Sequence, residues 1–272
     1  MDLPGACQSR RRPRRAPGDR RLDGARRRAA VGCGRAGAGR GAMTVVLLHA
    51  FPLDERMWAP QRQALAEEEV EAPNLYDLEG SSLDVWAERL LGDVEGELVL
   101  VGASMGGYLA LAMAASAPDR VRGLLLAGAR PDADSPERRA ARADTIALVE
   151  DQGAKGLWET MRPKLLAEDA PDDTVALARD SSLARSRDEL IRAVEAIRDR
   201  RDSTALVDSL EVPVVFAVGA GDSFFPVDEA RAAADRAKNG RVVVFDGSAH
   251  LPNLEQPEEF NATLRELLQA AR

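Results

Sequence analysis

The stretch Glu97–Ser116, ELVLVGASMGGYLALAMAAS, joins two apolar runs of different character through a glycine-containing turn. Glu97–Val101 is typical of a buried β-strand, and the Ala- and Leu-rich run Gly106–Ser116 is typical of a helix. The residues between them fit G-x-S-x-G, which places a serine on a sharp turn where small neighbours avoid backbone clashes. The spacing alone is common. Its position between a strand and a helix predicts an exposed, nucleophilic Ser104.

Short β-branched runs alternate with helical stretches on both sides of this turn, which is typical of parallel strands joined by crossover helices. The further strands that we expect are Thr44–Leu48, Val70–Ala72, Val121–Ala127, Val212–Val218 and Arg241–Phe245. The further helices that we expect are Trp58–Glu68, Leu83–Leu91, one around Val227–Ala237, and Glu258–Ala270. The sequence therefore predicts an α/β domain at 43–272 with a mostly parallel central sheet flanked by helices. Charged helical segments replace the strand signal at about 131–209, so we expect a helical cap insertion there.

Charge is distributed unevenly along the 272 residues, whose net charge is −8. Residues 1–42 contain 12 Arg and three acids, which leaves residues 43–272 with a net charge of −17. A body this acidic repels polyphosphate, which argues against nucleic-acid binding by the folded part. Residues 1–42 lack large apolar side chains, so we expect a disordered leader. We interpret it as translated sequence upstream of a true start at Met43; a basic arm and a targeting segment are the alternatives.

The sequence has few of the residues that thiol chemistry and metal binding require. Both cysteines, Cys7 and Cys33, lie in the leader, so the body has no thiol. His49 and His250 are the only histidines, and we expect no metal site and no cofactor. No run of about 18 apolar residues occurs, so we expect no transmembrane helix. We predict a cytoplasmic location, while the oligomeric state is not readable from the sequence.

A serine hydroxyl needs a base to remove its proton, and histidine is the usual one. His250 follows the last expected strand in Gly247-Ser248-Ala249-His250, where a loop residue can project over the ends of a parallel sheet. Ligands bind at those strand ends in open α/β sheets. His250 is therefore the candidate general base.

The acid that orients this histidine must follow a strand between the serine and the histidine. Asp222 in Gly219-Ala220-Gly221-Asp222 meets that condition after Val212–Val218. Asp228 is more typical of a helix start, and Asp246 is so close to the histidine that one short loop would have to present both. Asp222 is the candidate acid, with a turn-forming role as its simplest alternative.

His49 ends the first strand at the same edge of the sheet and could compete as the base. It precedes the serine, whereas the nucleophile-elbow fold orders its members serine, acid, histidine. We therefore interpret His49 as a brace for the loop that follows. The backbone N–H groups of Phe51 in that loop and of Met105 after the serine are the candidate oxyanion hole.

Four motifs together resemble the α/β-hydrolase family: His49-Ala50-Phe51-Pro52-Leu53-Asp54, Gly102–Gly107, Gly219–Asp222 with Pro226, and Gly247–His250. The resemblance spans Thr44 to the C-terminus. The first motif and Met57-Trp58 resemble the small-cap branch that contains 3-oxoadipate enol-lactonase, non-haem perhydrolases and carboxylesterases. Three features depart from the family pattern: Ala50 replaces a glycine, Pro73-Asn74-Leu75-Tyr76 replaces Pro-Asp-Leu-Pro, and Arg- and Gly-rich sequence occupies the place of the initial β-hairpin.

The resemblance implies a serine hydrolase that cleaves a small-molecule carboxylic ester or lactone through an acyl-enzyme on Ser104. Branches that open epoxides or displace halide carry Asp at this position, which argues against both reactions. A cofactor-free perhydrolase or haloperoxidase with the same triad is one alternative, and a non-catalytic ligand-binding member of the fold is another. An anionic lactone would need cap arginines such as Arg138 and Arg142 to offset the negative body. The cap residues that we expect to bind substrate are Trp158, Met161 and Leu165, with Leu157.

Overall fold

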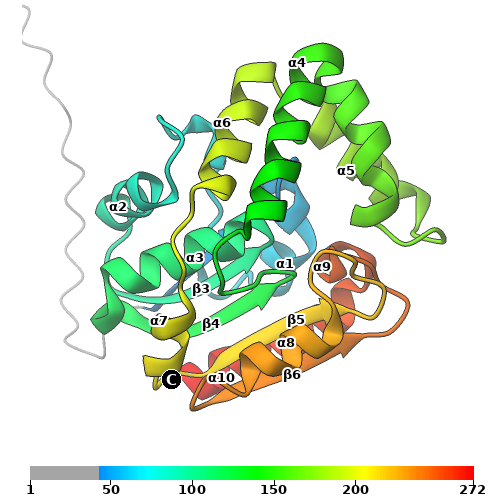
Figure 1. Cartoon of the computed structure of the whole chain (residues 1–272). Coiled ribbons are helices and arrows are strands. Elements are labelled where there is room, and N and C mark those ends of the chain that lie inside the picture. The colour runs from blue at the N-terminus through cyan, green and yellow to red at the C-terminus, as the bar shows by residue number, and fades with distance from the viewer. Residues whose placement is uncertain (1–42) are drawn as a thin grey trace, which may run out of the picture. The chain divides into compact units, whose positions relative to one another are not determined.

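The computed structural model describes residues 43–272, and the predicted leader lies outside the described residues. Six strands form one wholly parallel sheet in the order β2-β1-β3-β4-β5-β6. Figure 1 shows helices covering the sheet, as the sequence predicts. The strands are β1 (Met43–Leu48), β2 (Glu69–Glu71), β3 (Glu97–Ala103), β4 (Val121–Ala127), β5 (Val214–Gly219) and β6 (Gly240–Phe245).

Alternating side chains give the sheet two separate cores. Val46 and Leu48 of β1 belong to the core shared with α2 (Leu83–Asp93), α3 (Met105–Ser116) and α8 (Val227–Ala234). Val45 and Leu47 belong to the opposite core, which includes residues of α9 (Pro252–Glu255) and α10 (Pro257–Ala271). A strand buried on both faces can be apolar at every position, and this explains the uninterrupted run in β1.

Several expected boundaries differ from those of the structure, and two of the differences have local reasons. The helix expected at Trp58–Glu68 is shorter: a 3₁₀ turn at Glu55–Trp58 precedes α1, which covers only Ala59–Ala64. Three successive acids at 67–69 follow α1, where negative charge opposes the helix dipole. β5 begins at Val214 rather than at residue 212 because Pro213 has no N–H to donate to the sheet.

The predicted helical insertion lies between β4 and β5. It consists of α4 (Pro136–Leu165), α5 (Asp172–Leu183), α6 (Arg187–Arg198) and α7 (Thr204–Ser209). α4 is kinked at Gly153, which has a φ of 64°. Residues with a side chain disfavour this conformation. None of the helices within residues 43–272 is long and apolar enough to cross a membrane.

Because all strands are parallel, their carboxyl ends meet at one edge of the sheet. The loops that leave β1, β3, β5 and β6 at this edge contain the four residues that the sequence singles out: His49, Ser104, Asp222 and His250. A site built at this edge therefore collects side chains that lie up to 201 positions apart, from His49 to His250.

Candidate active site

Ser104 occupies the turn between β3 and α3 in a conformation that side chains rarely adopt. Its φ is 50° and its ψ is −113°, and it is the only non-glycine residue within 43–272 with positive φ. Such a conformation costs roughly 1–3 kcal/mol and persists only where the surroundings enforce it. The Ser104 N–H donates to the Ala127 carbonyl over 2.7 Å, and its own carbonyl accepts the N–H of Gly107 over 2.9 Å. The turn is the sharp serine elbow that the motif predicts.

The two motif glycines are required by close backbone approach. A Cβ at Gly102 would lie 2.2 Å from the Gly106 carbonyl oxygen, and one at Gly106 would lie 2.0 Å from the Leu48 carbonyl oxygen. Real Cβ atoms do not tolerate such distances from backbone. Gly102 therefore lets the turn close on its own backbone, and Gly106 lets it pack directly against the end of β1.

His250 and Asp222 form a buried pair. The His250 Nδ1 atom lies 2.8 Å from the Asp222 Oδ2 atom, and the two side chains are 3% and 0% exposed. The other carboxylate oxygen, Oδ1, accepts the N–H groups of Phe224 over 2.8 Å and Phe225 over 3.1 Å. Asp222 thus stabilises a turn and bonds to the imidazole at the same time, because its two oxygens have different partners.

A cavity of about 290 Å³ brings Ser104 and His250 together, since both residues line it. Within residues 43–272 no direct hydrogen bond joins them, and such bonds are often loose before substrate binds. Because Nδ1 is bonded to the acid, the Nε2 atom of His250 is the one available as a base. The remaining lining residues are Phe51, Tyr108, Arg130, Arg138, Ala141, Arg142, Asp144, Thr145, Thr160, Met161, Lys164, Ile197 and Phe224.

The backbone donors expected for an oxyanion flank the serine. Met105 is the first residue of α3, where helix N–H groups lack an intrahelical acceptor. Phe51 lies in the loop after β1 and lines the same cavity as Ser104. Among residues 43–272 no acceptor takes either N–H, so both remain available for a substrate oxygen.

His49 is a brace and not a second base. The Leu75 N–H donates to its Nε2 atom over 2.9 Å, and its Nδ1 atom lies 3.1 Å from the Ala50 carbonyl, to which it donates. Both ring nitrogens are thus used within the core. Burial lowers the pKa of His49 from 6.5 to about 4, so the folded protein holds the neutral ring near pH 7.

This burial gives the protein a pH-dependent stability. Between pH 6.5 and 4 the unfolded chain binds a proton at His49 that the folded chain does not bind, so acid favours unfolding. We expect this group to lower the free energy of unfolding by about 2 kcal/mol between pH 7 and pH 5. Urea unfolding of the wild type and of His49→Asn at both pH values measures it. An equal pH dependence in the two proteins would contradict the expectation.

Glu255 is a neighbour of the candidate site that sequence reasoning missed. Its carboxylate accepts the Ser248 hydroxyl over 2.8 Å, the Ala249 N–H over 3.0 Å and the Ala167 N–H over 2.6 Å. Burial raises its pKa above the usual range, against the effect of these donors. Glu255 therefore ties the loop that carries the histidine to the chain just after α4. The sequence gives no signal for the contact between Glu255 and Ala167, because these two residues lie 88 positions apart.

Two other neighbours of the imidazole were also missed. The ring of Phe224 lies 4.7 Å from the ring of His250, centroid to centroid. Gly128, with φ of 59°, follows β4, and a Cβ there would lie 2.7 Å from the Cε1 atom of His250. The first packs against the imidazole, and the second leaves room for it. The sequence shows that a glycine follows the strand, but it does not show that this glycine packs against His250.

The expected cap residues separate into two groups. Met161 lines the cavity, whereas Trp158 and Leu165 are buried in the core and are not among the lining residues. Leu157 is likewise fully buried in the core. The carbonyl of Leu165 accepts the His250 N–H over 3.2 Å, so it supports the site through its backbone. Within residues 43–272 no group of three or more His, Cys, Asp or Glu side chains could hold a metal ion.

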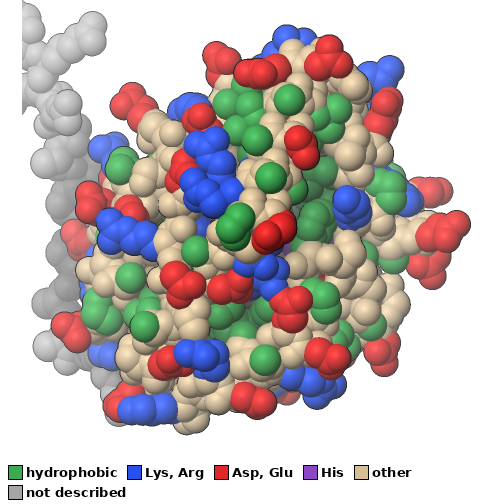
Figure 2. Space-filling view, in the orientation of Figure 1, with side chains coloured by type: hydrophobic (Ala, Val, Ile, Leu, Met, Phe, Trp, Pro, Cys, Tyr) green, Lys and Arg blue, Asp and Glu red, His purple; other side chains and the backbone are tan. Residues whose placement is uncertain are grey.

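The cap arginines reach the cavity with their charge already compensated. Arg138 and Arg142 both line it. Arg138 pairs with Asp132, and Arg142 lies 3.0 Å from Asp134. Figure 2 shows basic and acidic side chains mixed over the face of the molecule that it draws. The two cap arginines that the sequence offered for an anion are therefore already paired with acids.

Residues 45–263 match the model of the alpha/beta hydrolase family. A pimeloyl-[acyl-carrier protein] methyl ester esterase of Aromatoleum aromaticum is 30% identical over 235 residues, which cover 79% of this chain and 94% of the relative. A protein of the same description from Chromobacterium violaceum is 26% identical, with 83% of this chain and 94% of the relative covered.

Two solved structures are also similar. A thermophilic esterase from Thermogutta terrifontis, solved with malate bound, has a TM-score of 0.79 and 32% identity over 85% of this chain and 92% of its own. The enol-lactonase from Burkholderia xenovorans LB400 has a TM-score of 0.71 and 24% identity over 84% of this chain and 92% of its own. At that identity the enol-lactonase shares the fold, and its substrate does not transfer.

Proposed function

The chain belongs to the alpha/beta hydrolase family, and we propose that it is a carboxylic ester hydrolase that acts through an acyl-enzyme on Ser104. The observation that carries the proposal is the buried hydrogen bond between His250 and Asp222 beside the cavity that Ser104 lines. The esterases among its relatives and structural neighbours support the same class of reaction.

The proposed reaction begins when the Ser104 Oγ atom attacks the ester carbonyl while the Nε2 atom of His250 takes its proton. The Asp222 carboxylate stabilises the imidazolium that forms. The N–H groups of Phe51 and Met105 stabilise the oxygen as it gains negative charge. The imidazolium then donates its proton to the leaving alcohol as the carbonyl–alkoxy bond breaks. Water, deprotonated by the same imidazole, releases the acid and restores the serine.

We propose a neutral aliphatic ester with a small alcohol, such as a methyl ester, as the substrate class. The curated relatives are named for methyl ester cleavage, and the compensated arginines of the cavity favour a neutral group over a dicarboxylate lactone. Apolar Phe51, Met161 and Phe224 offer a surface for an aliphatic chain. The cytoplasmic location that we expect from the sequence remains a prediction.

The test combines covalent labelling with a substrate panel. A fluorophosphonate probe should label the wild-type protein at one site, which mass spectrometry should locate on the peptide that contains Ser104. Methyl and p-nitrophenyl esters should be hydrolysed faster than small lactones. A protein that is neither labelled nor active on any ester would instead be the non-catalytic binding member of the fold. Faster turnover with peroxide than with water would favour the perhydrolase alternative.

A further inference from the structure

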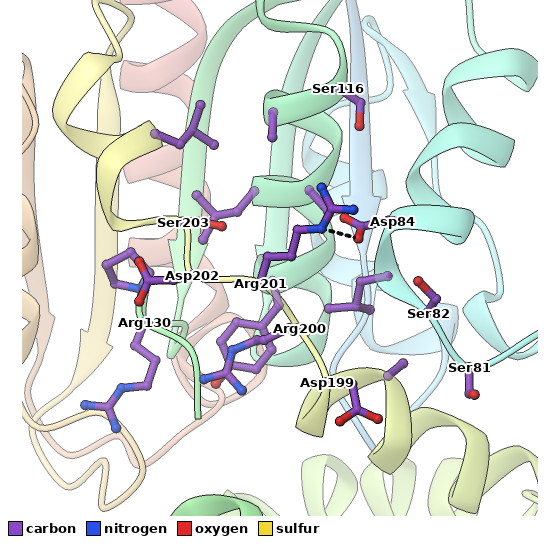
Figure 3. A pocket seen from close by; sticks show the side chains of 18 residues that line it. Ser81, Ser82, Asp84, Ser116, Arg130, Asp199, Arg200, Arg201, Asp202 and Ser203 are labelled. Atoms are coloured by element: carbon purple, nitrogen blue, oxygen red, sulfur yellow. Dashed lines mark ion pairs between the residues drawn. The ribbon is translucent and has the colours of Figure 1, made fainter. Parts of the chain in front are cut away.

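A second cavity of about 330 Å³ adjoins the candidate active site. It lies between α3, the start of α2 and the loop from Asp199 to Ser203 that returns from the insertion (Figure 3). Tyr108 and Arg130 line both cavities. The two spaces are therefore neighbours that share a wall.

The helix that carries the nucleophile runs beneath both cavities. Ser104 and Tyr108 line the first, while Tyr108, Leu111, Ala112 and Ala115 line the second. Positions spaced by three or four residues lie on one face of a helix. At 1.5 Å per residue, this face extends about 16 Å from Ser104 to Ala115. Tyr108 stands on it where one cavity ends and the other begins.

The Arg200 side chain holds the side chain of Tyr108 in place. The Arg200 guanidinium carbon lies 4.1 Å from the centroid of the Tyr108 ring. That guanidinium is itself fixed: its Nη1 atom lies 2.7 Å from Asp134 and donates to the Ile197 carbonyl over 2.9 Å. Its Nη2 atom donates to the Asp132 carbonyl over 2.9 Å. Because this arginine is buried and ion-paired, its contact with the Tyr108 ring restricts the ring to one position between the two cavities.

The second cavity has a mixed lining, and its apolar part suits an aliphatic chain. Leu83, Leu111, Ala112 and Leu206 give it an apolar lining. Polar groups contribute as well, and Figure 3 shows Arg201 directed toward Asp84, with which it forms an ion pair of 2.7 Å. The Arg201 side chain is 80% exposed, so this pair lies at the solvent side. The remaining polar lining residues labelled in Figure 3 are Ser81, Ser82, Ser116, Arg130, Asp199, Arg200, Asp202 and Ser203.

We propose that Tyr108 sets the length limit of the acyl chain by closing the substrate cavity against the second cavity. The inference rests on the proposed function, because it assumes that the first cavity receives the acyl group of an ester. A small residue at position 108 would join the two cavities into one continuous groove along α3. Longer acyl chains would then extend past Arg200 into the second cavity.

The test measures kcat/KM for p-nitrophenyl esters from acetate to dodecanoate. The variants are Tyr108→Ala and Tyr108→Leu, with Tyr108→Phe as the matched control that keeps the ring under Arg200. Wild type and Tyr108→Phe should share one length limit. In Tyr108→Ala the ratio of dodecanoate to butyrate turnover should rise about tenfold or more, since each newly buried methylene contributes about fourfold.

A second substitution checks where the longer chain goes. Ala112→Leu fills part of the second cavity, so it should reverse the gain in the Tyr108→Ala background and leave the wild-type ratio unchanged on its own. A folded Tyr108→Ala protein with an unaltered ratio would overturn the inference, as would a gain that Ala112→Leu does not reverse.

The two proposals fail in different ways. A wrong assignment of Tyr108 leaves hydrolysis of short esters intact in the wild type and changes no length preference. A wrong function removes ester hydrolysis and fluorophosphonate labelling from the wild type, and the inference is then overturned with it. Where thermal melting shows that Tyr108→Ala does not fold, Tyr108→Leu decides by the same ratio, with a smaller expected rise.

Discussion

Replacing Ser104 by alanine is expected to lower kcat for ester hydrolysis by roughly a millionfold and to abolish fluorophosphonate labelling. The hydroxyl is the atom that becomes acylated, so its removal leaves only the residual rate enhancement due to oxyanion contacts and substrate positioning. The variant should fold, because alanine keeps the backbone bonds of the elbow to Ala127 and Gly107. Steady-state kinetics, with thermal melting as a folding check, measures the effect.

The matched control lies on the same helix. Ser116 is exposed at the end of α3, and Ser116→Ala should retain labelling and turnover within about twofold, as is usual for surface substitutions. Labelling that persists in the Ser104→Ala protein would place the reactive hydroxyl elsewhere. Thr145 and Thr160 also line the cavity and would then be the residues to examine.

The sequence predicts the sheet well because its signal is local. β4 has the expected bounds at Val121–Ala127, and the other strands differ by one or two residues at their ends. A parallel strand that is buried on both faces is apolar at most of its positions, so a short apolar run marks it without knowledge of its partners. The shortened α1 shows the limit of such signals, since its end depends on charge near the helix terminus.

The site was predictable to the extent that topology determines it. Ser104, Asp222 and His250 follow strands of one parallel sheet, and the expected acid and base form a hydrogen bond of 2.8 Å. Glu255 was missed because its role appears only when the end of α4 packs against the histidine loop. The partition at Tyr108 was missed for the same reason, since Arg200 reaches the ring from 92 positions away.

Asp134 shows how the insertion is held over the site. Its carboxylate lies 2.7 Å from Arg200, 3.0 Å from Arg142 and 3.4 Å from Arg138. Burial opposes its ionisation, but Arg142 and Arg200 lower its pKa on balance. Asp134 precedes α4 and Arg200 follows α6. One ion-pair cluster therefore joins the two ends of the segment from α4 to α6 that covers the cavity. The same cluster fixes the arginine above Tyr108, which couples the anchoring of the insertion to the shape of the cavity.

Asp222→Asn is expected to lower kcat by roughly ten-thousandfold while leaving the fold intact. The Oδ1 atom of Asp222 already accepts two backbone N–H groups, from Phe224 and Phe225, so the asparagine amide oxygen should stay there. Its NH₂ group would then face the Nδ1 atom of His250. The imidazole would have to carry its proton on Nε2, where it could no longer take the proton of Ser104.

Two other aspartates provide matched controls for this charge removal. Asp228 and Asp246 are exposed and were the alternatives that the sequence left open. Asp228→Asn and Asp246→Asn should each keep kcat within about twofold, since exposed substitutions seldom disturb a site. A normal kcat in Asp222→Asn would show that the buried hydrogen bond does not orient the base. A large loss in Asp246→Asn would instead move the role of the acid to the loop that carries His250.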